Sequence, residues 1–121
     1  MLYLHGNAHN RAQPHRVALY RQLLSLGYYV LAVDYRGFGD SSPVELGEAS
    51  VVADARAALH WVTSKLGDRA RVVVWGHSLG TAVASHMVAD WDLETGGDSP
   101  VSGLVLESPF NNMLEEVQTF R

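Results

Sequence analysis

Short apolar runs alternate with longer amphipathic segments along the 121-residue chain. Apolar positions recur at helical spacing over residues 14–26 and 50–66, and a glycine, Gly27 or Gly67, follows each segment as expected at a helix end. A third helix is predicted from residue 81 to 88, and another is expected to begin after residue 112. Runs rich in β-branched and aromatic residues are typical of buried strands, and they cover residues 1–4, 28–33, 71–75 and 103–106.

The helix patterns also predict where each helix begins and which of its side chains face the core or the solvent. Pro14 favours the first turn of a helix, and Ser50 is predicted to be the N-cap of the second. In that second helix, Asp54, Arg56 and Lys65 are expected to face outward. The apolar face of the first helix is predicted to comprise Val17, Leu19, Tyr20, Leu23, Leu24 and Leu26.

Strands that alternate with helices predict an α/β fold: a parallel sheet with helices on both faces, joined by right-handed crossovers. A chain of this length corresponds to one domain with a modest core. In such sheets ligands bind beyond the carboxyl ends of the strands, where the strand order reverses. Candidate chemistry is therefore sought in the segments that follow the strands.

The strongest chemical motif lies where the third predicted strand meets the third helix. A strand that turns directly into a helix leaves little room for Cβ atoms two residues either side of the turn, which explains a glycine at each of those positions. A serine between them projects its hydroxyl from the sheet edge, where the helix N-terminus favours developing negative charge. The motif has the G-x-S-x-G spacing of a nucleophile elbow and consists of Gly76, His77, Ser78, Leu79 and Gly80.

Acyl transfer needs a nucleophile, a base, an orienting acid and two hydrogen-bond donors for the oxyanion. Ser78 is predicted to be the nucleophile, and the backbone N–H of Leu79 the first oxyanion donor. The second donor should come from the loop after the first strand, where Asn7 follows His5 and Gly6. Both segments follow the carboxyl ends of strands, so we expect them at the same rim of the sheet.

Composition narrows the possible functions. A net charge of −4, with no run of Lys or Arg, argues against nucleic acid as a partner. The absence of cysteine excludes disulfides, thiolate catalysis and Cys-ligated metals, and no predicted helix carries two histidines at the spacing of a metal site. We therefore expect neither a metal nor another cofactor. No apolar stretch reaches the ~20 residues that cross a bilayer.

Four segments, in the same order along almost the whole chain, together resemble one family. The group they are similar to is the α/β-hydrolase domain-containing 12 and 12B group, serine hydrolases that act as monoacylglycerol and lysophosphatidylserine lipases. The segments are residues 2–8 (Leu-Tyr-Leu-His-Gly-Asn-Ala), 34–41 (Asp-Tyr-Arg-Gly-Phe-Gly-Asp-Ser), 75–81 (Trp-Gly-His-Ser-Leu-Gly-Thr) and 106–110 (Leu-Glu-Ser-Pro-Phe).

The resemblance implies a partial α/β-hydrolase fold in which the four strands are the third to sixth of about eight. It also implies Ser78 as the acyl-enzyme nucleophile, Asn7 and Leu79 as oxyanion donors, and a lipid ester as substrate. For a full-length parent it implies the endoplasmic reticulum membrane, with an anchoring helix that is not among these residues. Two departures from the family are His9, where its loop usually has glycine, and the absence of Gly-Thr-Pro after Ser41.

Two members of the expected triad are missing from the chain. In this fold the chain order is serine, acid, histidine. The only histidine after Ser78 is His86, on the helix that leaves the elbow, where it cannot reach the serine hydroxyl. We therefore expect the triad acid and histidine beyond Arg121 and the first strands before Met1. Residues 1–121 are interpreted as the central part of a single α/β-hydrolase domain.

Other titratable residues have simpler interpretations than catalysis. His77 adjoins Ser78, but side chains of neighbouring residues diverge at the turn. His5 is expected to pack and to hydrogen-bond, and Asp34 to anchor its glycine-rich loop. Glu107, at a strand end, is either a displaced triad acid or a loop-anchoring carboxylate. The remaining histidines expected at the surface are His9, His15 and His60.

The predicted function is hydrolysis of carboxylic esters of lipids, monoacylglycerols or lysophospholipids, through a Ser78 acyl-enzyme. Two alternatives remain open. One is a protein depalmitoylase or thioesterase, because such enzymes share a similar His-Gly-Asn loop. The other is a non-catalytic form that binds lipid or a partner without turnover, which the missing triad histidine favours for this polypeptide.

Overall fold

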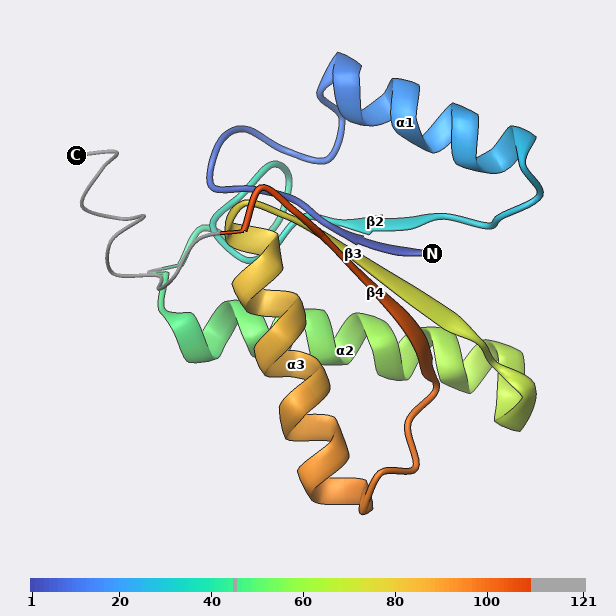
Figure 1. The fold of residues 1–121 in the computed structure, drawn as a ribbon. Helices are drawn as coiled ribbons and strands as arrows, with labels where there is room; N and C mark the ends of the chain where they lie inside the picture. Colours follow the sequence, from blue (N-terminus) through green and yellow to red (C-terminus); the bar gives the residue numbers. More distant parts are fainter. Residues whose placement is uncertain (45, 110–121) are drawn as a thin grey trace.

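Helices and strands alternate along the computed structural model, which describes residues 1–44 and 46–109 (Figure 1). The four predicted strands and the three predicted helices are confirmed, and the helix expected after residue 112 lies outside the described residues. The elements are β1 (Leu2–Leu4), α1 (Pro14–Ser25), β2 (Leu31–Val33), α2 (Glu48–Leu66), the short 3₁₀ turn η1 (Gly67–Arg69), β3 (Val72–His77), α3 (Leu79–Thr95) and β4 (Val101–Glu107).

The four strands form one parallel sheet in the order β2-β1-β3-β4. In β1, Leu4 lies opposite Val33 of β2 on one side and Gly76 of β3 on the other. The chain therefore winds outward from β1 to β2 and then returns across β1 to β3. The direction of winding reverses between β1 and β3, and ligands of open α/β sheets bind beyond the carboxyl ends of the strands at such a point.

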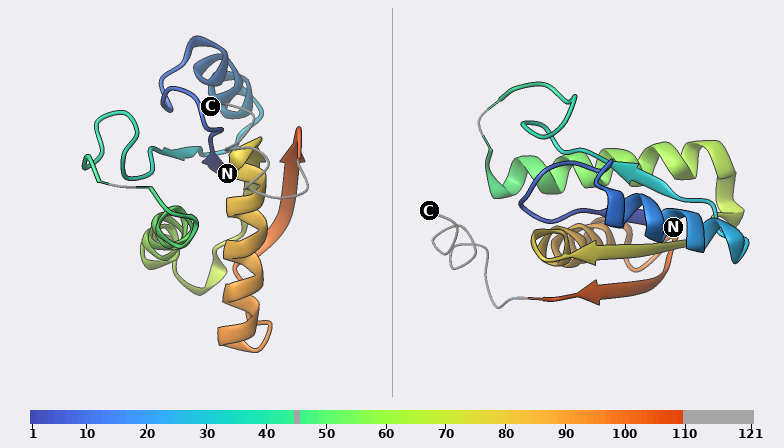
Figure 2. Two further views of the ribbon diagram at one scale, coloured as in Figure 1. Left: turned by 90° about the vertical axis from the view of Figure 1, so that its left-hand side faces the viewer. Right: turned by 90° about the horizontal axis from the view of Figure 1, so that it is seen from above.

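Helices cover both faces of the sheet, as predicted, with α1 on one face and α2 and α3 on the other (Figure 2). Successive side chains of a strand point to opposite faces. Tyr3 of β1 accordingly meets Tyr20 of α1 edge to face, with ring centroids 5.2 Å apart. Leu2 and Leu4 are fully buried on the opposite face, in a core with Val51, Val52, Ala55, Leu59, Val83, Ala84 and Met87.

The predicted apolar face of α1 is only partly covered. Leu23 is buried, whereas Leu24 and Leu26 are 53% and 72% exposed. Among the described residues α1 is the one helix on its face of the sheet, so nothing there packs against its outer side. The helical spacing was predicted correctly, but the extent of burial depends on the neighbours that a helix finds.

Several predicted boundaries were wrong. The third helix was predicted over residues 81–88, whereas α3 runs over Leu79–Thr95. Helix α2 begins at Glu48 with Gly47 as its N-cap, and Ser50 is the third helical residue. The Ser50 hydroxyl reaches back to Gly47, accepting its N–H at 3.0 Å and donating to its carbonyl at 2.7 Å, which is the contact that the third helical residue makes in a capping box. Residues 28–30 precede β2, which is short because β1 pairs with it only over Leu2–Leu4.

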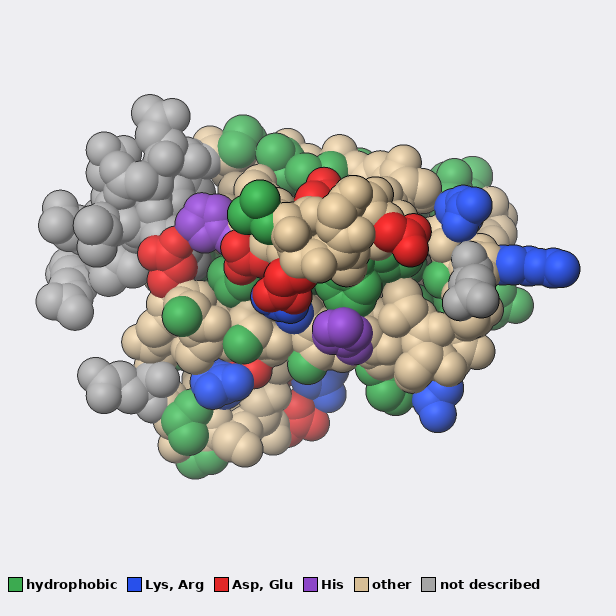
Figure 3. Space-filling view, turned by 90° about the horizontal axis from the view of Figure 1, so that it is seen from below, with side chains coloured by type: hydrophobic (Ala, Val, Ile, Leu, Met, Phe, Trp, Pro, Cys, Tyr) green, Lys and Arg blue, Asp and Glu red, His purple; other side chains and the backbone are tan. Residues whose placement is uncertain are grey.

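Two α2 side chains expected to face solvent instead make contacts between elements. The Asp54 carboxylate accepts hydrogen bonds from the Arg36 backbone and guanidinium, and Arg56 pairs with Glu94 of α3. The Asp54 and Arg56 side chains are less than one quarter exposed, at 23% and 22%. Figure 3 shows the side of the molecule that α2 and α3 form, where acidic side chains gather with histidines among them.

Candidate functional site

Ser78 lies directly between β3 and α3, at the carboxyl edge of the sheet (Figure 1). Its backbone has φ +51° and ψ −115°, a conformation that side-chain-bearing residues rarely adopt. Hydrogen bonds hold it there, since its N–H donates to the Glu107 carbonyl at 2.9 Å and its carbonyl accepts the Thr81 N–H at 2.8 Å. The predicted strand, strained turn and helix are confirmed.

The two glycines of the motif avoid two different collisions. A Cβ atom on Gly76 would overlap the Gly80 carbonyl oxygen and lie 2.8 Å from the Thr81 Cα. A Cβ atom on Gly80 would overlap the Leu4 carbonyl oxygen and lie 2.7 Å from its carbonyl carbon. Gly76 therefore permits the turn, as the sequence indicated, while Gly80 permits α3 to lie against the end of β1.

The loop after β1, residues 5–13, borders Ser78. A Cβ atom on Gly6 would lie 3.3 Å from the Ser78 Cβ and 3.1 Å from the His77 Nδ1. Asn7 follows immediately and is half-buried, and within residues 1–44 and 46–109 its backbone N–H has no hydrogen-bond acceptor. Leu79 is the first residue of α3, so its N–H has no acceptor within the helix. The fold thus brings Ser78 together with both predicted donors.

A buried arginine that the sequence analysis missed holds this loop. Arg16 of α1 is 3% exposed, and its guanidinium donates to the carbonyls of Ala8 at 3.0 Å and Asn10 at 2.5 Å. A signal was present in the sequence. Arg16 precedes Tyr20 and Leu23 by four and seven residues, which places it on the same helix face as these apolar side chains.

Asp34 ties the loop after β2 to the loop after β1. Its carboxylate is 3% exposed and accepts two hydrogen bonds from Arg11, one from the backbone N–H and one from the guanidinium, both at 2.6 Å. The guanidinium also bonds Asp40 and lowers the pKa of that carboxyl. The Ser41 hydroxyl donates to the Asp34 backbone carbonyl at 2.7 Å. The expected role of Asp34 as an anchor is confirmed, and it extends to residues 5–13.

His5 is completely buried, as expected of a packing residue. Its ring contacts Tyr35 and Phe38, with centroids 4.7 Å and 5.1 Å away. Nδ1 lies 2.7 Å from the Gly6 carbonyl oxygen, and Nε2 lies 3.1 Å from a carboxylate oxygen of Asp34. Burial lowers the pKa of His5, which favours the neutral ring. Both of these oxygens can only accept a hydrogen bond, so a neutral ring donates to one of them and not to the other.

The other titratable residues lie apart from this arrangement or serve as anchors. The Glu107 carboxylate accepts the Trp75 indole N–H at 2.9 Å, which supports the anchoring interpretation. His86 lies 2.9 Å from Glu48 of α2. His77 has a buried Nδ1 without a hydrogen-bond partner among the described residues. The predicted surface positions of three histidines are confirmed for His9, His15 and His60.

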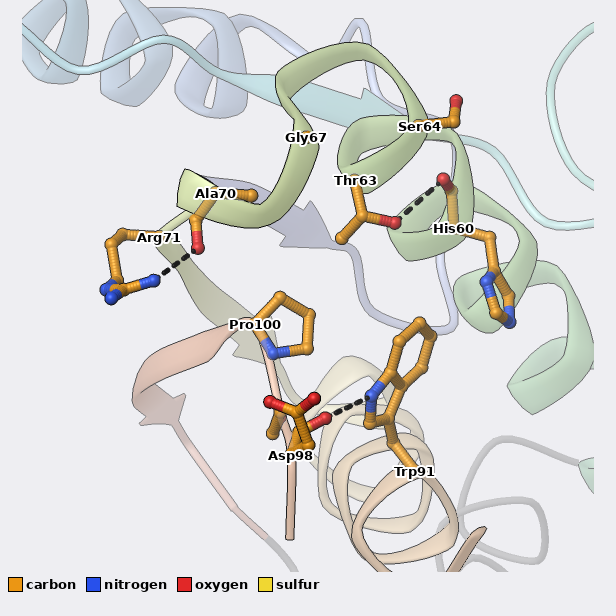
Figure 4. Close-up of a pocket in the computed structure, with 10 residues that line it drawn as sticks. His60, Thr63, Ser64, Gly67, Ala70, Arg71, Trp91, Asp98 and Pro100 are labelled. Atoms are coloured by element: carbon orange, nitrogen blue, oxygen red, sulfur yellow. Dashed lines mark hydrogen bonds between the residues drawn. The ribbon is translucent and has the colours of Figure 1, made fainter. Parts of the chain in front are cut away.

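A hollow of about 480 Å³ lies at the other end of the sheet (Figure 4). Arg71 and Pro100 on its wall directly precede β3 and β4, so it faces the amino ends of these strands rather than Ser78. His60 stacks on Trp91 there, with centroids 4.4 Å apart. In the part of the chain that the structure describes, no group of three or more acidic or histidine side chains could hold a metal, and no helix is both long and apolar enough for a membrane span.

Comparison with known proteins identifies the family of this arrangement. A family model described as the alpha/beta hydrolase fold matches residues 1–121. The chain belongs to the α/β-hydrolase family. A crystal structure of a putative hydrolase from Agrobacterium vitis superposes with a TM-score of 0.74 at 17% identity, over 99% of this chain and 49% of that one. A putative hydrolase from Legionella pneumophila superposes with a TM-score of 0.62 at 25% identity, over 92% and 34%.

Curated relatives confirm the resemblance that the four sequence segments indicated. The chain is 46% identical over 121 residues to lysophosphatidylserine lipase ABHD12 of Gallus gallus and 48% identical over 122 residues to that of Xenopus tropicalis. It is 46% identical over 115 residues to protein ABHD12B of Homo sapiens. These alignments cover 98%, 98% and 93% of this chain, which spans 30% of the length of each relative.

His9, which stands where the family usually has glycine, has φ +63°. Glycine adopts this left-handed conformation without steric strain, because it has no Cβ atom. We expect His9→Gly to raise the free energy of unfolding by about 1 kcal/mol, because it removes the left-handed strain of a residue with a Cβ. Urea titration measures the change. Ala8→Gly is the matched control, since the neighbouring Ala8 lacks a positive φ and should lose stability. A lower stability of His9→Gly would contradict the prediction.

Proposed function

We propose that residues 1–121 are the central part of a larger α/β-hydrolase domain, and that Ser78 of this domain attacks carboxylic esters of lipids. The observation that carries the proposal is the strained Ser78 at the reversal of winding, with Gly6 against it and Asn7 next to Gly6 in the chain. The similarity to lysophosphatidylserine lipases supports a monoacylglycerol or lysophospholipid as the substrate. The triad acid and histidine would come from outside these residues.

The Ser78 hydroxyl would attack the ester carbonyl carbon while the histidine base takes its proton. The N–H groups of Leu79 and Asn7 would hold the oxyanion of the tetrahedral intermediate. Collapse of the intermediate breaks the ester bond, and the protonated base returns its proton to the departing alcohol. Water then attacks the acyl-enzyme by the same route and releases the fatty acid. Each oxyanion donor is worth about 3 kcal/mol in such reactions.

Release of fatty acid from defined substrates tests this function. The whole domain would be supplied with oleoyl lysophosphatidylserine, oleoyl glycerol or a palmitoyl thioester peptide. We expect turnover of at least one lipid ester to exceed turnover of the thioester. The reverse order would favour the depalmitoylase alternative, and binding of lipid by a folded domain without release of fatty acid would favour the non-catalytic one.

A further inference from the structure

The strained backbone of Ser78 depends on a residue of the neighbouring strand. The Ser78 N–H donates to the backbone carbonyl of Glu107 at 2.9 Å, and Glu107 is the last residue of β4. In the pairing of β3 with β4, Glu107 lies opposite His77, the residue before Ser78. A residue with φ +51° keeps that conformation only where its surroundings hold it. The position of the Glu107 carbonyl therefore helps to set where the Ser78 hydroxyl projects.

The chain leaves β4 through a second strained residue, Ser108. Its φ of +53° is a conformation that residues with a Cβ atom rarely adopt. Pro109 follows, and the residue before a proline is restricted to extended conformations with a negative φ. Both effects favour rotation of the Ser108 backbone toward a negative φ, which would move the adjoining Glu107 carbonyl. A contact that holds Glu107 in place therefore also protects its bond to Ser78.

Trp75 of β3 makes that contact. Its indole N–H donates to the Glu107 carboxylate at 2.9 Å. Trp75 lies opposite Val105 of β4, so the Trp75 and Glu107 side chains point to the same face of the sheet and meet along the diagonal between the two strands. Glu107 is thus bonded to the strand and turn of the elbow twice, through its side chain at Trp75 and through its backbone at Ser78.

We propose that Trp75 and Glu107 are positioning residues, and that their hydrogen bond holds the Ser78 backbone in the conformation that aims the nucleophile. The inference rests on the proposed function, because Ser78 is a nucleophile only if it attacks a carbonyl. In this role the Glu107 carboxylate serves as an acceptor for the indole, and not as a displaced triad acid.

Glutamine and leucine at position 107 separate an acceptor from an acid. The side-chain oxygen of glutamine can still accept the indole N–H, whereas leucine has no acceptor. We expect Glu107→Gln to keep kcat on the preferred lipid ester within about twofold of the wild type. Glu107→Leu should lower kcat by about 5–50-fold with KM changed less than about twofold, because a misplaced nucleophile slows the reaction step more than it weakens binding. A loss in Glu107→Gln as large as that in Glu107→Leu would overturn the proposal.

Trp75→Phe removes the donor and keeps an aromatic ring. We expect it to lower kcat as Glu107→Leu does, and the double variant to lose no more than the larger single loss, because both changes remove one bond. Trp91→Phe is the matched control, since the Trp91 indole donates to the Asp98 carbonyl at 3.3 Å at the other end of the sheet. It should leave kcat unchanged. Losses that multiply in the double variant, or an equal loss in Trp91→Phe, would overturn the proposal.

Hydrogen exchange of the Ser78 N–H in the whole domain gives a measurement that does not depend on turnover. We expect exchange to be about tenfold faster in Trp75→Phe and Glu107→Leu than in the wild type and Glu107→Gln. The control is the Leu31 N–H, which bonds the Met1 carbonyl between β2 and β1 and should keep its rate in every variant.

The exchange experiment also separates this inference from the proposed function. Unchanged exchange at Ser78 would overturn the positioning role of Trp75 and Glu107 even if the domain is an active hydrolase. Conversely, faster exchange in Trp75→Phe and Glu107→Leu, together with a Ser78→Ala variant that keeps full activity, would contradict the proposed function and not the contact between Trp75 and Glu107.

Discussion

Replacing Ser78 by alanine in the whole hydrolase domain is expected to abolish covalent labelling by a fluorophosphonate and to lower kcat by about ten-thousand-fold or more. The hydroxyl oxygen is the atom that would bond to phosphorus or to the acyl carbon, and no other group can replace it at the turn. The backbone hydrogen bonds of residue 78 to Glu107 and Thr81 do not involve the hydroxyl, so the elbow should persist in the variant. Gel fluorescence and fatty acid release measure the two effects.

Ser85→Ala is the matched control for this prediction. Ser85 lies on α3, is half-buried, and donates its hydroxyl to the Thr81 carbonyl at 2.9 Å. Its loss should leave labelling intact. Labelling of Ser78→Ala at the wild-type rate would contradict the assignment of the nucleophile.

The same reagent tests where the base lies. A folded chain of residues 1–121 that stays unlabelled would support a histidine and acid from outside these residues. Labelling of this chain that Ser78→Ala removes would mean that a base is supplied from within it or from a second copy. That result would contradict our interpretation of the chain as a part without the complete triad.

Gly80→Ala is expected to lower the free energy of unfolding by more than about 3 kcal/mol and to remove activity. The added Cβ would overlap the carbonyl oxygen of Leu4, which is backbone in a central strand and cannot rotate away. Relief requires α3 to move off β1 or the β1 and β3 pairing at Leu4 and Gly76 to shift. Either movement displaces Ser78, and urea titration and turnover measure the result.

Gly103→Ala in β4 is the matched control for Gly80→Ala, because it also adds a Cβ atom to a glycine of this domain. The nearest atom to its added Cβ is a Val73 methyl carbon at 3.5 Å, an ordinary van der Waals distance. We expect Gly103→Ala to change the free energy of unfolding by less than about 1 kcal/mol. A Gly80→Ala variant as stable as Gly103→Ala would show that the close approach of α3 to β1 is not required.

Local patterns in the sequence were sufficient to predict the helices, the strands and the nucleophile elbow. Helical and strand periodicity, together with Pro14 and Gly27, predicted the positions of seven elements because these preferences act over a few residues. The spacing of Gly76, Ser78 and Gly80 predicted the strained turn for the same reason. Ser50 shows the limit even of local prediction, since it lies at the third helical position, with its hydroxyl bonded to Gly47, rather than at the predicted N-cap.

The tertiary structure alone decided how distant segments meet around Ser78. Strand order placed the reversal of winding between β1 and β3, and long-range pairing of this kind leaves no local pattern in a sequence. The bonds of Arg11 to Asp34 join residues 23 positions apart. Arg16, which the sequence analysis missed, is buried and donates to the carbonyls of residues 8 and 10. Sequence by itself therefore determined the nucleophile candidate and its turn. The packing of charged side chains between loops determined the geometry around it, because a buried charge is stable only where the fold supplies its partners.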